Sequence, residues 1–210
     1  MLGGQWWVSD EQDGSGYDIF ARRFGRVIPD AENCPAIVDG TCTSGFSKGF
    51  VLIKETAGKE KLVAKLIKGP MIAQTDFGDP LAAAGTKYNL CIYDDTAELE
   101  VERAGDTNCS GGASVCWAAL GPAPPDGKGY KYKDRLFSSD GVFKILYKAG
   151  DAGKSKAIVK GMGSNLPDNL ASSLQSSTSV AIQLRSSNGV CLSGTASDVG
   201  KNDPDFFIAK

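Results

Sequence analysis

Short segments in which hydrophobic and polar residues alternate recur along most of the chain. They are rich in β-branched and aromatic residues, and Gly, Asp, Asn or Pro bounds them. Alternation with a period of two is typical of strands that bury one face. The predicted strands are 50–54, 61–68, 88–93, 97–102, 129–134, 142–148, 156–161, 179–186 and 205–210.

Helical periodicity is nearly absent. Only the segments 81–85 and 169–174 could form helix, one turn each. With 26 glycines to supply turns, the spacing of the strands predicts an all-β sandwich or barrel.

The chain also repeats itself. KGFVLIKE from Lys48 recurs as KGYKYKDR from Lys128, and the segment 61–69 is echoed by 141–150. A turn with Pro and Asp and then a strand follow each copy, at 76–93 and again at 165–184. We therefore predict two related β-sandwich-like units in tandem. They are 34–127 and 128–210, preceded by a β-hairpin and linker at 1–33.

Composition narrows the possible functions. The formal net charge of −2 and the isoelectric point near 5.3 indicate no general attraction to nucleic acid or anionic membrane, which would need a basic face. No apolar run approaches the about 18 residues of a membrane helix. The chain has no histidine, the usual general base near neutral pH and a common zinc ligand. We expect no nucleic-acid partner, no membrane span and no histidine-based catalysis.

Six cysteines indicate an oxidising compartment. Cys34 and Cys42 bracket one short loop and Cys109 and Cys116 another, which favours two local disulfides over free thiols. The pairing of Cys91 with Cys191 stays open. The chain starts MLGGQWWVSDEQ, without the basic and apolar blocks of a signal peptide. We therefore expect an extracellular or cell-surface fragment of a longer protein, and whether Met1 is a natural start stays open.

Motifs that could carry catalysis lack their structural context. GFSKG, residues 45–49, matches a nucleophile elbow, but a strand follows it and no histidine can activate Ser47. The aspartates at 76, 79, 94 and 95 lie in turn-like sequence and indicate solvated turn residues more than a hydrolase pair. We predict no catalytic residue.

Two sets of residues could bind ligands. Trp117, Tyr130 and Tyr132 are candidates for stacking on sugar rings, although core packing is favoured for most aromatic residues. Asp13 and Asp18 lie in DGSGYDIF, which approximates the calcium-binding RTX nonapeptide. RTX sites are built by stacked copies and this chain has one copy, so we expect weak calcium binding or none, and no other cofactor.

Two stretches resemble known protein families. WWVSDEQDGSGYDIFARRFG, residues 6–25, resembles the end of one unit of a tandem repeat of very large secreted bacterial proteins. Residues 48–210 resemble a duplicated β module at the C-termini of large, secreted, myxobacteria-like proteins, through LIKG (66–69), KGYKYKD (128–134), DGVFKILYKAG (140–150) and KSKAIVKGMGSNLPD (154–168). The resemblance implies an architecture, an extracellular location and other domains of a parent chain as partners, and it brings no catalytic residues.

The function we predict is a non-catalytic, extracellular or cell-surface module with a structural or adhesive role. The first alternative is a carbohydrate-binding module that stacks aromatic rings on polysaccharide, with or without calcium. The second alternative is a hydrolase that uses carboxylates.

Overall fold

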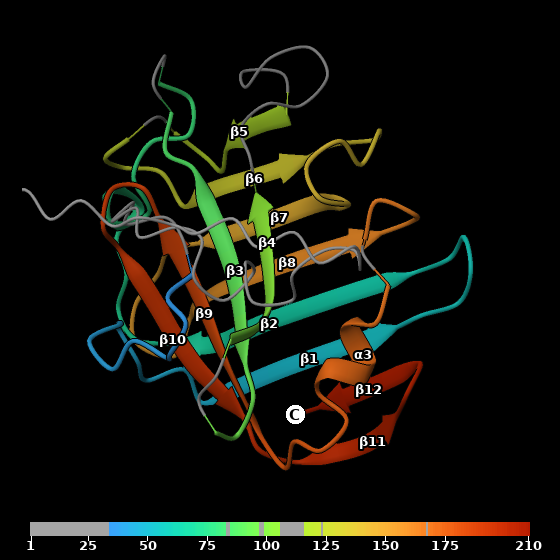
Figure 1. Cartoon of the computed structure of the whole chain (residues 1–210). Helices are drawn as coiled ribbons and strands as arrows, with labels where there is room; N and C mark the ends of the chain where they lie inside the picture. Colours follow the sequence, from blue (N-terminus) through green and yellow to red (C-terminus); the bar gives the residue numbers. More distant parts are fainter. Residues whose placement is uncertain (1–33, 83–84, 97–98, 106–115, 123, 167) are drawn as a thin grey trace, which may run out of the picture.

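A computed structural model describes residues 34–210, apart from 83–84, 97–98, 106–115, 123 and 167. The predicted hairpin at 1–33, with the calcium candidates Asp13 and Asp18, lies outside the described residues. Within the described part, the prediction of an all-β fold is confirmed (Figure 1). The helices with described bounds include η1 (Gln74–Phe77) and α3 (Leu170–Ser173), and α3 coincides with the helical turn predicted at 169–174.

The described residues form twelve strands, and nine of these correspond to the predicted strands. They are β1 (Lys48–Lys54), β2 (Lys61–Gly69), β3 (Tyr88–Tyr93), β4 (Leu99–Gly105), β5 (Trp117–Ala119), β6 (Gly129–Lys133), β7 (Val142–Lys148), β8 (Ser155–Met162), β9 (Val180–Ser186), β10 (Cys191–Ala196), β11 (Val199–Asp203) and β12 (Phe206–Ala209). The pattern did not predict β5, β10 and β11.

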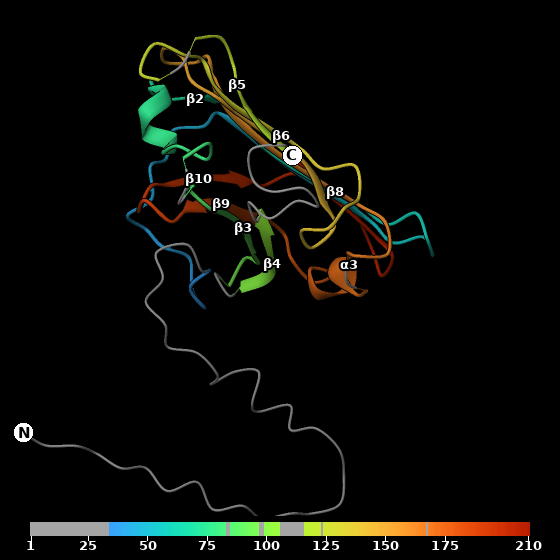
Figure 2. The ribbon, with the colours of Figure 1, turned by 90° about the horizontal axis from the view of Figure 1, so that it is seen from above.

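The strands form two stacked antiparallel sheets. The large sheet has the order β11-β12-β1-β2-β8-β7-β6-β5, and the small sheet has the order β10-β9-β3-β4. Figure 2 shows the two layers from their edge, with the small sheet on one face of the large one. The core lies between them because alternate residues point inward: Val51 and Ile53 of β1 and Leu62 and Leu66 of β2 are almost fully buried.

Strands from both halves of the chain contribute to both sheets. β2 pairs with β8 in the large sheet, and β3 pairs with β9 in the small sheet. The predicted boundary between units 34–127 and 128–210 falls between β5 and β6, which also pair with each other. The sheet pairings thus join the two predicted units instead of separating them.

The strand orders have an internal symmetry. We count strands outward from the central pairs, β2/β8 in the large sheet and β3/β9 in the small sheet. Each of the strands β1 to β6 then occupies the position equivalent to that of the strand six numbers later, as β1 does to β7 and β6 to β12. The echo between 76–93 and 165–184 therefore joins equivalent strands, β3 and β9. The echo between 48–55 and 128–135 does not, because it compares β1 with β6.

Two long-range disulfides attach residues 34–43 to the small sheet. Cys34 bonds to Cys91 of β3, 57 residues away, and Cys42 bonds to Cys191 of β10, 149 residues away. The predicted local bond between Cys34 and Cys42 is therefore wrong. Tight turns around a cysteine do not decide its partner, because a disulfide needs two Cα atoms within about 7 Å in the folded chain. Cys116 is also in a disulfide, and Cys109 lies outside the described residues.

A polar contact holds the same segment against β9. Gln183 donates from Nε2 to the backbone oxygen of Asp39 at 2.7 Å, and Arg185 Nη1 donates to Asp39 Oδ2 at 2.9 Å. Hydrogen bonds from Arg185 and Thr41 lower the pKa of Asp39 to about 2. The segment thus covers part of the outer face of the small sheet, whereas no described element covers the outer face of the large sheet (Figure 2).

Candidate functional site: a lysine face on the large sheet

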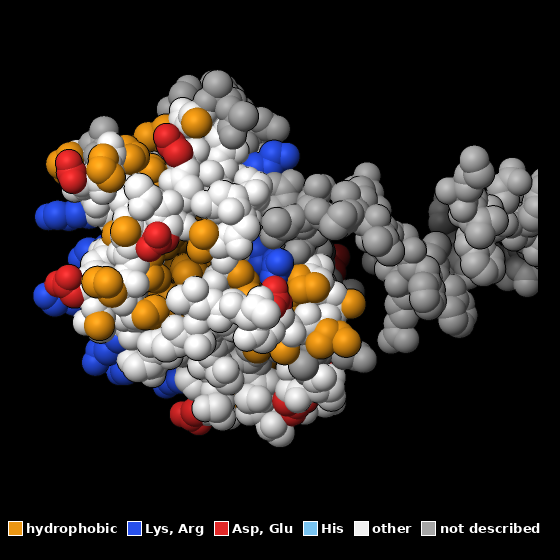
Figure 3. All heavy atoms as spheres, turned by 90° about the vertical axis from the view of Figure 1, so that its left-hand side faces the viewer, with side chains coloured by type: hydrophobic (Ala, Val, Ile, Leu, Met, Phe, Trp, Pro, Cys, Tyr) orange, Lys and Arg blue, Asp and Glu red, His pale blue; other side chains and the backbone are white. Residues whose placement is uncertain are grey.

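The outer face of the large sheet concentrates positive charge. Five neighbouring strands, β1, β2, β8, β7 and β6, carry lysines at positions that alternate with buried residues. These strands contain no acidic residue. Because alternate side chains point to the same side of a sheet, the lysines at these positions point away from the core, and Lys68, at the irregular end of β2, is not one of them. Figure 3 shows blue side chains in a column along its left edge, where the large sheet lies in that view.

We call this surface the lysine face. Its ten lysines are Lys48, Lys54, Lys61, Lys65, Lys131, Lys133, Lys144, Lys148, Lys156 and Lys160. With a strand spacing of about 4.8 Å and a rise of about 3.3 Å per residue, the array extends about 20 Å in both directions.

Sheet register places several lysines directly opposite one another. Lys144 of β7 lies between Lys133 of β6 and Lys160 of β8, so three ammonium groups form a row across three strands. Two more pairs of lysines also face each other, Lys54 with Lys61 and Lys148 with Lys156. Like charges directly opposite in a sheet destabilise it. The fold therefore carries four unfavourable cross-strand pairs on one face.

The electrostatic environment reflects this crowding. Partial burial, together with the charges of Lys144, Lys65 and Lys61, lowers the pKa of Lys160. Within the described part of the chain, no carboxylate forms an ion pair with any of the ten lysines. Because these lysines carry +10 and the whole chain carries −2, the remaining residues carry a formal charge of −12. The low net charge of the chain therefore conceals the positive charge of this face.

Aliphatic and aromatic side chains lie between the lysines, but they are only partly exposed to solvent. Phe50, Leu52, Leu146 and Ile158 are half-buried, and lysine stems can cover such residues while their ammonium groups stay in water. Among the large hydrophobic residues of these five strands, only Met162 is classed as exposed, at 38%. The face is thus charged and flat, without a protruding apolar patch.

The three aromatic residues proposed for sugar stacking lie in the core. Trp117, Tyr130 and Tyr132 are only 3%, 0% and 1% exposed. The Trp117 ring packs against Tyr132 and Tyr88, with centroids 5.2 and 5.1 Å apart. Stacking on a sugar needs an open ring face, so these residues cannot form the platform. These three residues pack in the core, as the sequence favoured for most aromatic residues.

Three of the four aspartates considered for hydrolysis serve as turn acceptors, and the fourth joins two distant segments. Asp76 Oδ2 accepts the Ala73 N–H at 2.7 Å, and Asp79 Oδ1 accepts the Leu81 N–H at 2.9 Å. Asp94 accepts hydrogen bonds from Thr96 in the same way, whereas Asp95 accepts them from Thr178, 83 residues further along the chain. The bonds from Thr178 lower the pKa of Asp95. Carboxylates that accept such bonds stabilise loops, which is the role expected of turn residues.

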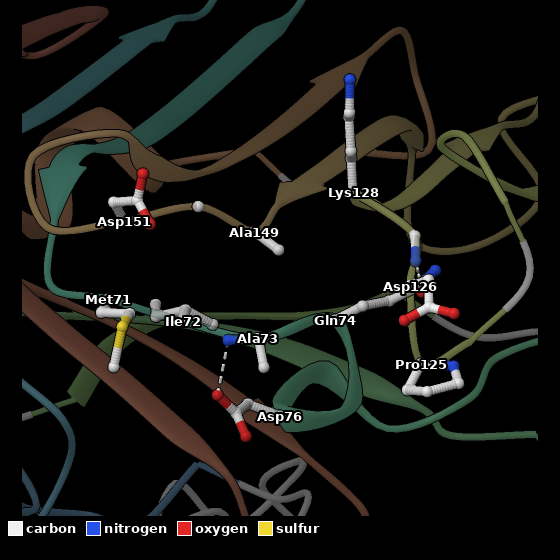
Figure 4. Close-up of a pocket in the computed structure, with 12 residues that line it drawn as sticks. Met71, Ile72, Ala73, Gln74, Asp76, Pro125, Asp126, Lys128, Ala149 and Asp151 are labelled. Carbon is white, nitrogen blue, oxygen red and sulfur yellow. Dashed lines mark hydrogen bonds between the residues drawn. The ribbon is translucent and has the colours of Figure 1, made fainter.

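Asp76 also lines a groove of about 390 Å³ between three loops (Figure 4). Asp126 and Asp151 belong to the other two loops, and Figure 4 shows the three carboxylates at different sides of the groove. The buried side chain of Gln74 ties the loops together, since Nε2 donates to the Gly129 oxygen and Oε1 accepts the Gly127 N–H. The described residues contain no cluster of three or more acidic, cysteine or histidine residues that could hold a metal.

The lysine face corrects the expectation that a near-neutral chain has no basic face. Net charge sums over the molecule and carries no information on how charge is distributed. The strand sequences already indicated the lysine face. Within a strand, lysines such as Lys48 and Lys54 of β1 or Lys61 and Lys65 of β2 are separated by an even number of residue positions, and buried residues occupy positions between them.

Comparison with known proteins gives no match: no family model, no curated protein and no solved structure is significantly similar to this chain. The resemblance to a duplicated module of secreted bacterial proteins therefore stays a prediction. No helix among the described residues is long and apolar enough to span a membrane.

Proposed function

We propose that this protein is a non-catalytic, extracellular adhesive module that attaches its parent chain to an acidic polysaccharide through the lysine face. The observation that carries the proposal is the array of ten lysines on five neighbouring strands whose sequences contain no acid. Four cross-strand lysine pairs cost stability. A repulsive array of this kind is expected where a ligand of opposite charge offsets the repulsion on binding.

The shape of the face supports a polymer over a membrane. Membrane-inserting surfaces expose large apolar side chains that enter the lipid. Here the apolar residues between the lysines are half-buried, so the contact is made by ammonium groups. Charges spread over about 20 Å suit a ligand that repeats its negative charge along its length, because many weak contacts then add.

The disulfides support an extracellular polymer over a nucleic acid. Two long-range bonds join 34–43 to the small sheet, and such bonds persist in oxidising environments. The polymers that repeat negative charge outside cells include acidic polysaccharides, which carry carboxylate or sulfate groups. This setting agrees with the extracellular location that the sequence predicts.

The test is binding to polygalacturonate, a linear polymer of uronic acid, with neutral dextran as the control polymer. We expect binding to polygalacturonate that weakens as salt rises, and none to dextran. The double variant Lys144→Glu/Lys160→Glu should weaken binding at least about tenfold. Lys87→Glu is the matched control, because Lys87 is an exposed lysine that precedes β3 of the small sheet and should leave binding unchanged.

Two results would contradict the proposal. Equal binding of wild type and the double variant would mean that the lysine face is not the contact surface. Tighter binding to double-stranded DNA or to anionic vesicles than to polygalacturonate would assign the face to another class of ligand.

A further inference from the structure

A groove adjoins the lysine face where β12 ends beside β1. β12 pairs with β1 only from Val51 to Lys54, so the first residues of β1, Lys48 to Phe50, have no strand partner on that side. The end of β10 and the residues that follow it pass close to this notch, as Figure 1 shows at the start of β1. The notch encloses about 420 Å³, within the size range of small-ligand sites.

A glycine makes this arrangement possible. A Cβ atom on Gly49 would lie 2.2 Å from the Thr195 backbone oxygen, closer than any real contact. The absence of a side chain at Gly49 therefore allows β10 to cross directly under β1. After the crossing, the chain is anchored by hydrogen bonds between Asp198 and Lys210, N to O at 2.9 Å in both directions. The walls of the groove are thus held by backbone contacts.

Positive charge and an aromatic ring are part of the groove lining. Lys48, Lys65 and Lys210 all contribute to the lining, as does the half-buried Phe50. The Lys65 ammonium group lies over the Phe50 ring, 4.5 Å from its centroid. A cation over an aromatic face is held by the ring quadrupole. Phe50 therefore acts as a positioning residue that keeps one ammonium group at the mouth of the groove.

Hydroxyl groups also line the groove. Ser47, Thr195 and Ser197 are exposed, and each hydroxyl can both donate and accept hydrogen bonds. Asp198 is the one acidic side chain in the lining and can accept hydrogen bonds from ligand hydroxyls. A lining that combines ammonium groups with hydroxyl and carboxylate groups matches a ligand that has an acidic group and several hydroxyls on a small ring.

We infer that this groove binds one acidic sugar unit of the polysaccharide, with its carboxylate or sulfate at Lys65 and its hydroxyls at Thr195 and Ser197. The inference rests on the proposed function and adds selectivity to it. The lysine face attracts any polyanion, whereas the groove recognises the sugar ring. A polymer that fills the groove with one unit lays its neighbouring charges across the face, so both contacts add.

The experiment measures binding of trigalacturonate by calorimetry, with tri-glutamate as a probe of equal charge that lacks a sugar ring. We expect the wild type to bind trigalacturonate at least about tenfold more tightly than tri-glutamate. Thr195→Val/Ser197→Ala removes two hydroxyls at exposed positions and should remove that preference, while tri-glutamate binding stays unchanged. Phe50→Leu should weaken trigalacturonate binding, because Lys65 loses its support. Ser176→Ala, at an exposed position near α3, is the matched control.

The outcomes separate this inference from the proposed function. If polygalacturonate binds but trigalacturonate and tri-glutamate bind equally, or if the hydroxyl variant retains the preference, the groove is not a sugar site and the lysine face alone carries binding. If polygalacturonate does not bind at all, the proposed function itself is wrong. Thermal unfolding of each variant, expected within about 2 °C of the wild type for exposed substitutions, excludes loss of fold as the cause.

Discussion

The row of three opposed lysines leads to a prediction that couples stability to binding in opposite directions. Lys144 faces Lys133 on one neighbouring strand and Lys160 on the other. Lys144→Glu replaces two repulsive pairs with two attractive ones. Cross-strand pairs contribute about 0.2–1 kcal/mol each, and exposed charges lie at the lower end of that range. We therefore expect the variant to be more stable by about 1 kcal/mol.

A gain of about 1 kcal/mol corresponds to a rise in Tm of about 2–4 °C for a chain of this size. Differential scanning calorimetry at low ionic strength measures it, with polygalacturonate binding followed in parallel. Lys144→Gln removes the repulsion without adding an attraction, so it should give about half of the gain. Lys87→Glu, at an exposed position before β3 of the small sheet, should leave polymer binding unchanged.

A lower or unchanged Tm for Lys144→Glu at low salt would refute this reasoning. It would mean that the three ammonium groups separate far enough in water for their repulsion to be negligible. The lysine face would then carry no stability cost. The binding role would be supported only by the array of lysines itself, and no longer by a repulsion that a ligand could offset.

Further predictions concern the ionic strength, the hydrogen bonds of Asp39, one disulfide and the core. Raising the ionic strength to about 0.5 M should raise Tm while it weakens polymer binding, because salt screens both repulsion and attraction. The pKa of Asp39 is lowered from 3.8 to about 2. The stability that ionised Asp39 contributes to the fold is therefore complete above pH 3.8 and is lost as pH falls through about 2. Asp39→Asn should cost about 1–2 kcal/mol at neutral pH and flatten the acid limb of a stability-against-pH curve. Cys42→Ser/Cys191→Ser should cost about 2–5 kcal/mol in denaturant unfolding, because the bond closes a loop that spans most of the described chain. Trp117→Ala should cost about 3–5 kcal/mol by the same measurement and should alter polymer binding only as far as the fold is lost.

The predicted and observed structures agree where local pattern decides the outcome. The alternation in 50–54 or 142–148 identifies a strand and its buried face without reference to any other strand, because a side chain's face depends only on its parity. The strands that were missed, β5, β10 and β11, are short or rich in small and polar residues, so their pattern is weak.

Long-range pairing decided the rest. Cys34 and Cys42 lie in turns that suit a local bond, yet each pairs with a strand of the small sheet, since the chain is brought there by the fold. Trp117 joined the core for the same reason.

The lysine face shows most clearly which features the sequence determined and which the tertiary structure decided. The sequence by itself determined that each of five strands carries lysines on its outer side, because the period of two places them opposite the buried residues. Only the strand order β1-β2-β8-β7-β6 decided that these sides form one continuous surface, and only the register placed Lys133, Lys144 and Lys160 in a row. Strand order and register depend on contacts between residues far apart in the chain, and net charge and local periodicity are independent of both.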